Sequence, residues 1–370
     1  MYLSTGQLVV SLRFETFRSK RPHPLAQCLE VHTTVTKEGM SYILDVLEEH
    51  VALLCSEKLC VWNWRTGALL AEVIQSRSDD ITNISFIAPG YILVVRLAAG
   101  LDGLQLCSFP LEPPSNPLDH PLLTRVIYQF PPFSGTSVLS DVRIQADRQT
   151  FLRLHNPSDA PTEAPLRPFH LSSQSRVFSL ELILSQTPHD VAKYANFVIF
   201  IIAPTFMKYV DPSQPAQEPR VVLGKDWLYD TRIFTGVNTP RVGEHQIAGS
   251  RVVFANHELD ELRVEVIDFN PEVAARAAGV PQRNWGDYST VPVEGPDGTE
   301  ITAIFGHAHI QDDFADPVVC AMPYTLSVKT VKVDPAERIY HEVCIDEERL
   351  VILKVSSLPI PRSRLTQVKR

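Results

Sequence analysis

Residues 50–70, HVALLCSEKLCVWNWRTGALL, carry the clearest strand pattern in the sequence. Short apolar runs at 51–55, 59–64 and 68–74 are separated by polar, turn-like residues. Three short strands joined by two tight turns predict an antiparallel meander, the repeating unit of a β-propeller blade. Because successive side chains of a strand point to opposite faces, the middle run predicts one face with Leu59, Val61 and Asn63 and another with Cys60, Trp62 and Trp64.

The pattern recurs along the chain. A second three-strand set is expected at 81–87, 91–97 and 103–109, about 40 residues after the first, which is a typical spacing of propeller blades. The whole chain predicts about 20 to 24 strands. Only one or two short helices are expected in its loops, one of them at 271–278 with proline in its first turn. We therefore predict an all-β fold, a β-propeller of about six to eight four-stranded blades that is divergent and WD-like.

Composition limits the class of protein. The 370 residues include 29 prolines and 16 glycines, which suits a loop-rich β protein. We expect a single propeller-like domain over residues 1–358, its N-terminus either complete or truncated, and a basic, disordered tail over 359–370. The formal net charge of -9 argues against nucleic-acid binding as the main function.

Cysteine usage and hydropathy indicate an intracellular protein. None of the six cysteines shows C-x-x-C spacing, so neither a cysteine zinc site nor a disulfide framework is predicted. The most apolar stretch, residues 197–207, is about half as long as a membrane helix needs, and Pro204 interrupts it. We interpret it as a buried strand, expect no membrane partner, and place the protein in the cytoplasm or nucleus.

Few sequence features point to catalysis. His307 and His309, in the stretch GHAHIQDDF, could share a metal with the aspartates that follow them, although a polar loop between strands explains the same residues. The sequence contains no G-x-S-x-G, no G-x-G-x-x-G and no G-x-x-x-x-G-K-[ST], so serine-hydrolase and nucleotide-binding chemistry have no support. No catalytic residue and no cofactor is predicted.

Large aromatic side chains are the candidate binding residues. Trp62 and Trp64 lie on one side of one strand and are expected in the core between sheets. Trp227, Trp285 and Tyr288 lie in loop-like contexts, where aromatics can contact a partner protein or plug the space between blades. The proline-rich and polar loops at 110–121, 156–168 and 211–219 are expected to build part of the same surface.

Several segments together resemble one protein family. They are VALLCSEKLCVWNWRTGALL at 51–70, ISFIAPGYILVV at 84–95, SRVFSLELIL at 175–184, VEVIDFNP at 264–271 and CIDEERLVILKV at 344–355. In this order they resemble the C-terminal propeller region of the F-box proteins of basidiomycete fungi. The resemblance implies a non-enzymatic protein-interaction module that recognises the substrates of a ubiquitin ligase.

One element of that family is not recognised in this sequence. The F-box is a helical module that precedes the propeller and binds the Skp-type adaptor of the ligase, whereas residues 1–49 already read as strands. We therefore expect a protein partner on one propeller face, and a Skp-type adaptor only if an F-box lies upstream. The alternative is a propeller enzyme or ligand binder with a metal near His307 and His309.

Overall fold

The structure is a computed structural model of the chain. The contacts divide the chain into two compact units, which are described separately: unit 1 (Met1–Thr239 and His307–Met322) and unit 2 (Pro240–Gly306 and Pro323–Arg370). The single domain predicted over 1–358 stays a prediction, and the predicted tail at 359–370 lies outside the described residues. The structure describes residues 7–15, 21–36, 42–55, 58–75, 81–97, 103–113, 122–135, 137–146, 176–185, 194–211, 218–235, 245–258, 261–279, 290–294, 299–310, 314–332, 339–345 and 350–356.

The predicted meander is confirmed as the first four-stranded sheet of unit 1. Its strands pair antiparallel in chain order. The predicted alternation is also confirmed: Leu59 and Val61 pack into one apolar cluster, whereas Cys60, Trp62 and Trp64 pack into the cluster on the opposite face. The strands are β3 (Tyr42–Leu47), β4 (His50–Cys55), β5 (Lys58–Asn63) and β6 (Ala68–Ile74).

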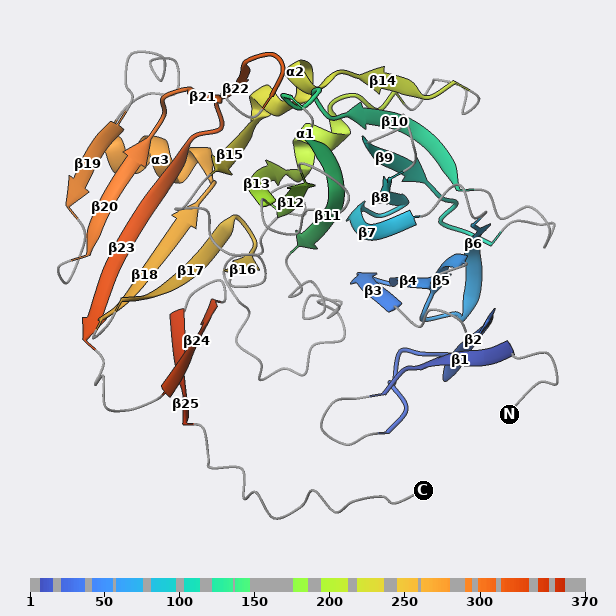
Figure 1. The fold of residues 1–370 in the computed structure, drawn as a ribbon. Coiled ribbons are helices and arrows are strands. Elements are labelled where there is room, and N and C mark those ends of the chain that lie inside the picture. The colour runs from blue at the N-terminus through green and yellow to red at the C-terminus, as the bar shows by residue number, and fades with distance from the viewer. Residues whose placement is uncertain are drawn as a thin grey trace, which may run out of the picture. The chain divides into compact units, whose positions relative to one another are not determined.

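Two further meander sheets follow in unit 1 (Figure 1). The second sheet begins at the predicted second set of strands, and the third begins after residue 137. The second sheet comprises β7 (Ile81–Ala88), β8 (Tyr91–Arg96), β9 (Gly103–Ser108) and β10 (Leu123–Gln129). The third comprises β11 (Val138–Ala146), β12 (Val177–Ser185), β13 (Tyr194–Ile202) and β15 (Thr231–Thr235).

The first strands of these three sheets pack side by side. β3 packs against β7, and β7 packs against β11. A polar network crosses the first of these contacts: Asp45 Oδ2 accepts hydrogen bonds from Phe86 N (2.7 Å) and Ser85 Oγ (3.1 Å). Arg176 Nη1 donates to the Phe86 carbonyl at 3.1 Å. Successive meanders joined through their first strands are the blades of a propeller, so the all-β, propeller-type fold is confirmed, while the number of blades stays a prediction.

The segment between β13 and β15 departs from the meander. The buried strand predicted over 197–207 ends at Ile202, and residues 203–207 form a short helix, because Pro204 lacks the N–H that a strand ladder needs and suits the first turn of a helix. A three-residue strand then pairs parallel with β10, at the edge of the preceding sheet. These elements are α1 (Ala203–Met207), β14 (Arg220–Val222), α2 (Gly224–Trp227) and the 3-10 helix η3 (Leu228–Asp230).

A separate two-stranded sheet lies over one face of the first meander. β1 (Gln7–Arg13) pairs antiparallel with β2 (Glu30–Thr36). β2 lies over β5, where the Thr33 hydroxyl is 3.6 Å from Cys60 Sγ. Apolar side chains of both strands join the cluster that contains Trp62 and Trp64. The pair therefore covers the β5 side of this face.

The turn after β5 contacts the chain segment that precedes β2 and holds it in place. Asn63 Oδ1 accepts hydrogen bonds from Arg65 N (3.0 Å) and Thr66 N (3.2 Å), and Gly67 adopts a φ of 76°. Only glycine reaches this conformation without strain. The absent side chain also makes room for Cys28, whose Cβ would lie 2.4 Å from a Cβ on Gly67. The sequence W-N-W-R-T-G thus closes the β5–β6 turn and positions Trp64.

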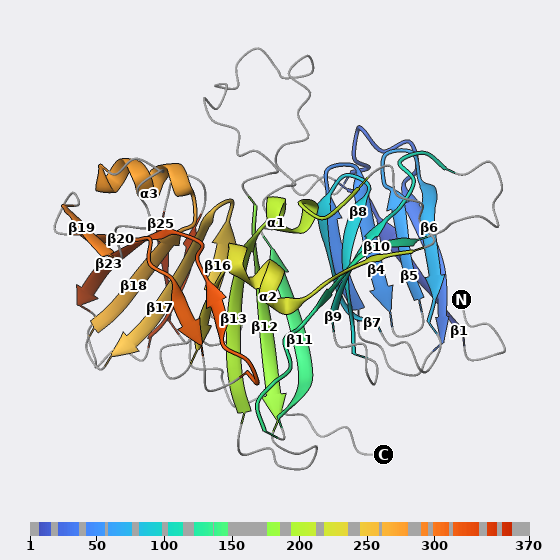
Figure 2. The same cartoon turned by 90° about the horizontal axis from the view of Figure 1, so that it is seen from above.

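Unit 2 contains a six-stranded antiparallel sheet in the order β16-β17-β18-β23-β20-β19. The predicted helix at 271–278 is confirmed as α3 (Pro271–Ala278); Asn270 caps its N-terminus, and Gly279 ends it with a φ of 64°. α3 packs against the β19, β20 and β23 side of the sheet (Figure 2). The strands are β16 (His245–Ala248), β17 (Arg251–Glu258), β18 (Glu261–Asp268), β19 (Thr290–Glu294), β20 (Glu300–Ile304) and β23 (Tyr324–Lys332).

Two hairpins complete the described strands. In unit 1, β21 (Ala308–Ile310) pairs with β22 (Val318–Cys320), and in unit 2, β24 (Ile339–Ile345) pairs with β25 (Leu350–Ser356). Residues 150–155, whose sequence also predicts a strand, lie outside the described residues. No helix within the described ranges is long and apolar enough to cross a membrane.

Candidate partner-binding groove

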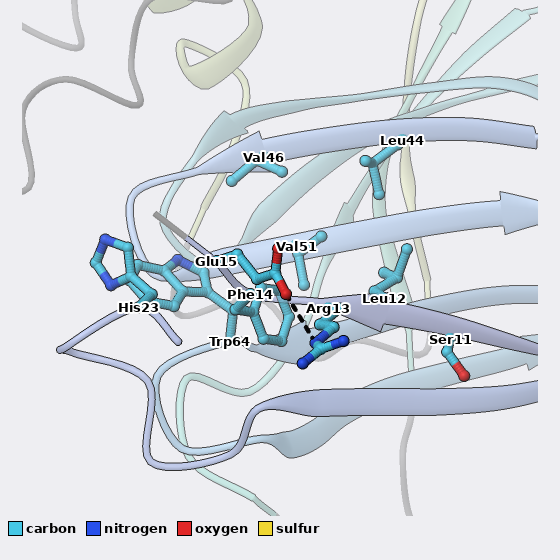
Figure 3. Close-up of a pocket in the computed structure, with 10 residues that line it drawn as sticks. All are labelled: Ser11, Leu12, Arg13, Phe14, Glu15, His23, Leu44, Val46, Val51 and Trp64. Carbon is cyan, nitrogen blue, oxygen red and sulfur yellow. Dashed lines mark ion pairs between the residues drawn. The ribbon is translucent and has the colours of Figure 1, made fainter. Parts of the chain in front are cut away.

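A pocket of about 370 Å³ opens in unit 1 between β1 and β3. Figure 3 shows Trp64, Phe14 and His23 gathered at one end of it, with Leu44 and Val46 on the wall that faces β1. We call it the β1–β3 groove. Its lining residues are Ser11, Leu12, Arg13, Phe14, Glu15, His23, Leu44, Val46, Val51 and Trp64.

Trp64 forms a fixed apolar end to the groove. Its indole Nε1 donates a 2.7 Å hydrogen bond to the Glu48 carbonyl, so the polar atom of the ring already has its partner. The His23 ring meets the indole edge-on with centroids 5.0 Å apart, and the Phe14 ring lies 5.9 Å away. Only 6% of the Trp64 surface is exposed, so the ring closes the end of the groove with a small apolar area and without a competing hydrogen bond.

The two walls of the groove are built differently. From β3 only Leu44 and Val46 line it, and side chains two residues apart share one face of a strand. From β1 and the residues that follow it, five consecutive residues, 11–15, line the groove. Consecutive side chains point to opposite faces, so what these five residues share is the backbone. β3 therefore presents a face to the groove, and β1 presents an edge.

The backbone groups at that edge can be assigned. Phe14 N donates to the Leu29 carbonyl at 3.0 Å, on the β2 side. In an antiparallel ladder the N–H and C=O of one residue point to the same side, and alternate residues point to opposite sides. The N–H and C=O groups of Val9, Ser11 and Arg13 thus point away from β2. Of the described strands, only β2 pairs with β1.

The face of β3 is exposed beside this edge. Leu44 is 54% exposed and Tyr42 is 42% exposed. Both side chains lie on the same face of β3 as Val46, which lines the groove. β2 lies over β5, and β1 lies beside β2 on the side towards β3. The two-stranded sheet of β1 and β2 therefore does not extend over β3. An exposed apolar row beside an unpaired strand edge is a feature of binding surfaces.

The rim of the groove carries a small net negative charge. Arg13 Nε lies 2.9 Å from Glu15 Oε1 and 3.9 Å from Glu30 Oε1. One guanidinium between two carboxylates leaves a net charge of about -1. The rim therefore disfavours an acidic ligand.

A row of Ser11, His32 and Glu30 on the outer face of β1 and β2 resembles a hydrolase triad in composition. The Ser11 hydroxyl and His32 Nδ1 share a 2.8 Å hydrogen bond, and His32 Nε2 lies 3.7 Å from Glu30 Oε2. A triad serine, however, sits on a strained turn beside oxyanion donors, whereas Ser11 lies within a regular strand. We interpret the row as cross-strand polar pairs, which contribute about 0.2–1 kcal/mol each to sheet stability.

Trp227, a predicted binding residue, is fully buried in the structure, with 0% of its surface exposed. Its indole Nε1 donates to the Gln129 carbonyl at 2.9 Å, and its ring packs on Tyr128 and Phe130. A side chain without exposed surface cannot contact a partner directly. The prediction that Trp227 binds a partner is therefore wrong, and the alternative prediction, that it fills space in the core, is favoured. Trp285 and Tyr288 lie outside the described residues.

The structure places His307 and His309 on an exposed part of unit 1. His307 Nε2 shares a 3.1 Å hydrogen bond with the Tyr229 hydroxyl. Among the residues that the structure describes, no three histidine, cysteine, aspartate or glutamate side chains are placed to hold a metal. The aspartates at 312 and 313 lie outside that part of the chain, so the metal alternative lacks a described third ligand.

The β1–β3 groove was not predicted from the sequence. In the sequence, its apolar residues have the pattern of ordinary strand residues. The face of β3 is exposed only because β1 and β2 cover the β5 side of the first sheet and not β3, and the sequence does not show this. The predicted loops at 110–121, 156–168 and 211–219 lie mostly outside the described residues. The described part of those loops therefore adds no residue to the groove.

Comparisons with known proteins leave the function open. No protein-family model matches the chain, and no curated protein is similar to it. Among solved structures, it is similar to the WD40 domain of SCAP from fission yeast, with 10% sequence identity and a TM-score of 0.30. The match covers 88% of this chain and 61% of that chain. At this TM-score the similarity supports no conclusion about the site, and the fold assignment rests on the sheets of unit 1.

Proposed function

We propose that the protein is a non-enzymatic protein-interaction module and that it binds its partner through the β1–β3 groove. The observation that carries this proposal is the exposed apolar face of β3, with Leu44 and Tyr42, beside the edge of β1 that pairs with none of the described strands. The groove lining supplies apolar surface and backbone hydrogen-bonding groups, which are the two elements of peptide recognition by extended segments.

Leu44→Glu tests the proposal. Leu44 and Leu111 are both 54% exposed in unit 1, but only Leu44 lines the groove. Leu111→Glu is therefore a matched control for the effect of an added surface charge. Partners captured from a cell extract should be lost with Leu44→Glu and kept with Leu111→Glu. Equal capture by both variants and the wild-type protein would place the partner surface elsewhere.

A finer proposal concerns the role of the bound partner. The resemblance to basidiomycete F-box proteins supports a substrate-recognition role in a cullin ubiquitin ligase, and it is the sole support for this role. The product of the full transcript should then co-precipitate a Skp-type adaptor and, separately, the groove-dependent partner. Binding of the partner without any adaptor would leave a protein-interaction module that works outside the ligase.

We also propose that the protein works inside the cell, in the cytoplasm or nucleus. Thiols persist in reducing compartments, and in the part of the chain that the structure describes Cys28, Cys60, Cys107 and Cys320 carry thiols that form no disulfide. A fluorescent fusion expressed in its native cells should remain in these compartments. Secretion of the fusion would contradict the proposal.

A further inference from the structure

We propose that the groove accepts one extended segment of a partner protein as an added strand beside β1; this inference rests on the proposed function. The added strand would pair with the N–H and C=O groups of Val9, Ser11 and Arg13, which point away from β2. It would extend the β1–β2 pair into a three-stranded sheet. Main-chain hydrogen bonds supply the affinity in this mode of recognition, and side chains at alternate positions supply the specificity.

The position of the added strand follows from the layers. β2 lies over β5, and the next strand beyond β1 would lie over β3, where the exposed side chains of Tyr42 and Leu44 lie. Every second side chain of the segment would then face β3. Binding would bury the exposed apolar surface of Tyr42 and Leu44 on β3.

The lining also specifies the chemistry of the segment. Side chains that point to β3 meet Leu44, Val46 and Val51 and should be apolar. At the Trp64 end, the indole and the Phe14 ring favour a large apolar side chain. Outward-facing positions should be neutral or basic, since the rim around Arg13 carries two carboxylates. The expected ligand is thus an extended segment with apolar residues at every second position and without acidic residues between them.

Ser11→Pro tests strand addition separately from groove binding. Proline removes the N–H of residue 11, which points away from β2. The N–H groups that bond to β2 belong to other residues and are kept, and edge strands tolerate proline at such positions for this reason. The substitution also removes the Ser11–His32 hydrogen bond. Ser11→Ala is the matched control, because it removes the same hydrogen bond but keeps the N–H.

The probes are dodecapeptides selected from a random display library against the wild-type protein. The selected peptides should alternate apolar residues, bind Ser11→Ala as tightly as wild type, and bind Ser11→Pro and Leu44→Glu at least about tenfold more weakly. N-methylation of the peptide amides that face β1 should weaken binding equally, and methylation of the intervening amides should have no effect. This second measurement keeps the test valid if Ser11→Pro fails to fold.

Other outcomes overturn different parts of the account. Peptides that need Leu44 but tolerate both Ser11→Pro and N-methylation would refute strand addition and leave the proposed function intact. Peptides that bind Leu44→Glu like wild type, or a library that yields no binder, would refute both proposals. Self-association of the wild-type protein that Ser11→Pro abolishes would assign the edge to a second copy of the chain.

Discussion

Asp45 should hold two blades together, and its replacement by alanine should destabilise unit 1 by about 3 kcal/mol. Its Oδ2 accepts from Phe86 N and Ser85 Oγ, across the contact between β3 and β7. Both donors belong to buried residues. A buried donor that loses its acceptor costs about 1–3 kcal/mol, so two lost acceptor contacts give a total near the stated value.

Asp45→Asn separates the hydrogen bonds from the charge. An amide oxygen at the Oδ2 position keeps both contacts to β7, while the amide nitrogen loses only the hydrogen bond from Val46 N. We expect a cost of about 1 kcal/mol. Burial raises the pKa of Asp45 above 3.8, despite its hydrogen bonds and the nearby Arg176. The ionised carboxylate therefore contributes less to stability than a protonated one would.

The pH dependence of Asp45 follows from this direction. Because its pKa is higher in the folded state, the folded protein binds the proton first as the pH falls. The free energy of unfolding should rise through the folded-state pKa and level off below 3.8. The difference in the free energy of unfolding between the wild-type protein and Asp45→Asn should show this rise, because the contributions of other titrating groups such as Glu181 cancel in that difference.

Urea denaturation followed by tryptophan fluorescence measures these effects, since Trp62, Trp64 and Trp227 are all buried in unit 1. Asp141→Ala is the control, because Asp141 forms an exposed ion pair with Arg143 and should change stability by less than about 0.5 kcal/mol. A cost below about 1 kcal/mol for Asp45→Ala, or equal costs for the alanine and asparagine variants, would refute the reasoning.

Three further predictions concern Trp227, Glu181 and Gly67. Trp227→Ala should cost about 4 kcal/mol and Trp227→Phe about 1–2 kcal/mol in urea denaturation; a negligible cost for both would show that the indole is not a core plug. Burial raises the pKa of Glu181 from 4.5 to about 7, so Glu181→Gln should be up to about 3 kcal/mol more stable than wild type above about pH 8 and nearly equal to it below about pH 4; a difference that does not depend on pH would contradict this. Gly67→Ala should lower stability by more than about 1 kcal/mol, through its positive φ and the approach of Cys28, and an unchanged thermal midpoint would contradict that expectation.

The meander sheets could be predicted because their evidence is local. In residues 50–74 each strand has its own alternation and each turn its own polar residues, so β4, β5 and β6 needed no tertiary information. The helix at 271–278 was predictable for the same reason, with Pro271 in its first turn.

The misjudged elements depend on context or are very short. Residues 203–207 are as apolar as the strand before them, and only the position of Pro204 distinguishes helix from strand. α2 has four residues, too few for a hydrophobic period, and Trp227 therefore read as part of a loop. The groove depends on which strand of the first sheet is covered, and this is a tertiary property that Leu44 and Ser11 do not reveal in the sequence.

Amide hydrogen exchange at residues 9–13 and 42–46, measured with and without a selected dodecapeptide, is the sharpest test of strand addition beside β1. We predict that the amides of Val9, Ser11 and Arg13 exchange rapidly in the free protein and become protected with the peptide, whereas those of Val10 and Leu12, which face β2, are protected in both states. If the amides at 9, 11 and 13 are already protected without a ligand, or remain unprotected when the peptide is bound, then no partner strand is added beside β1 in the β1–β3 groove.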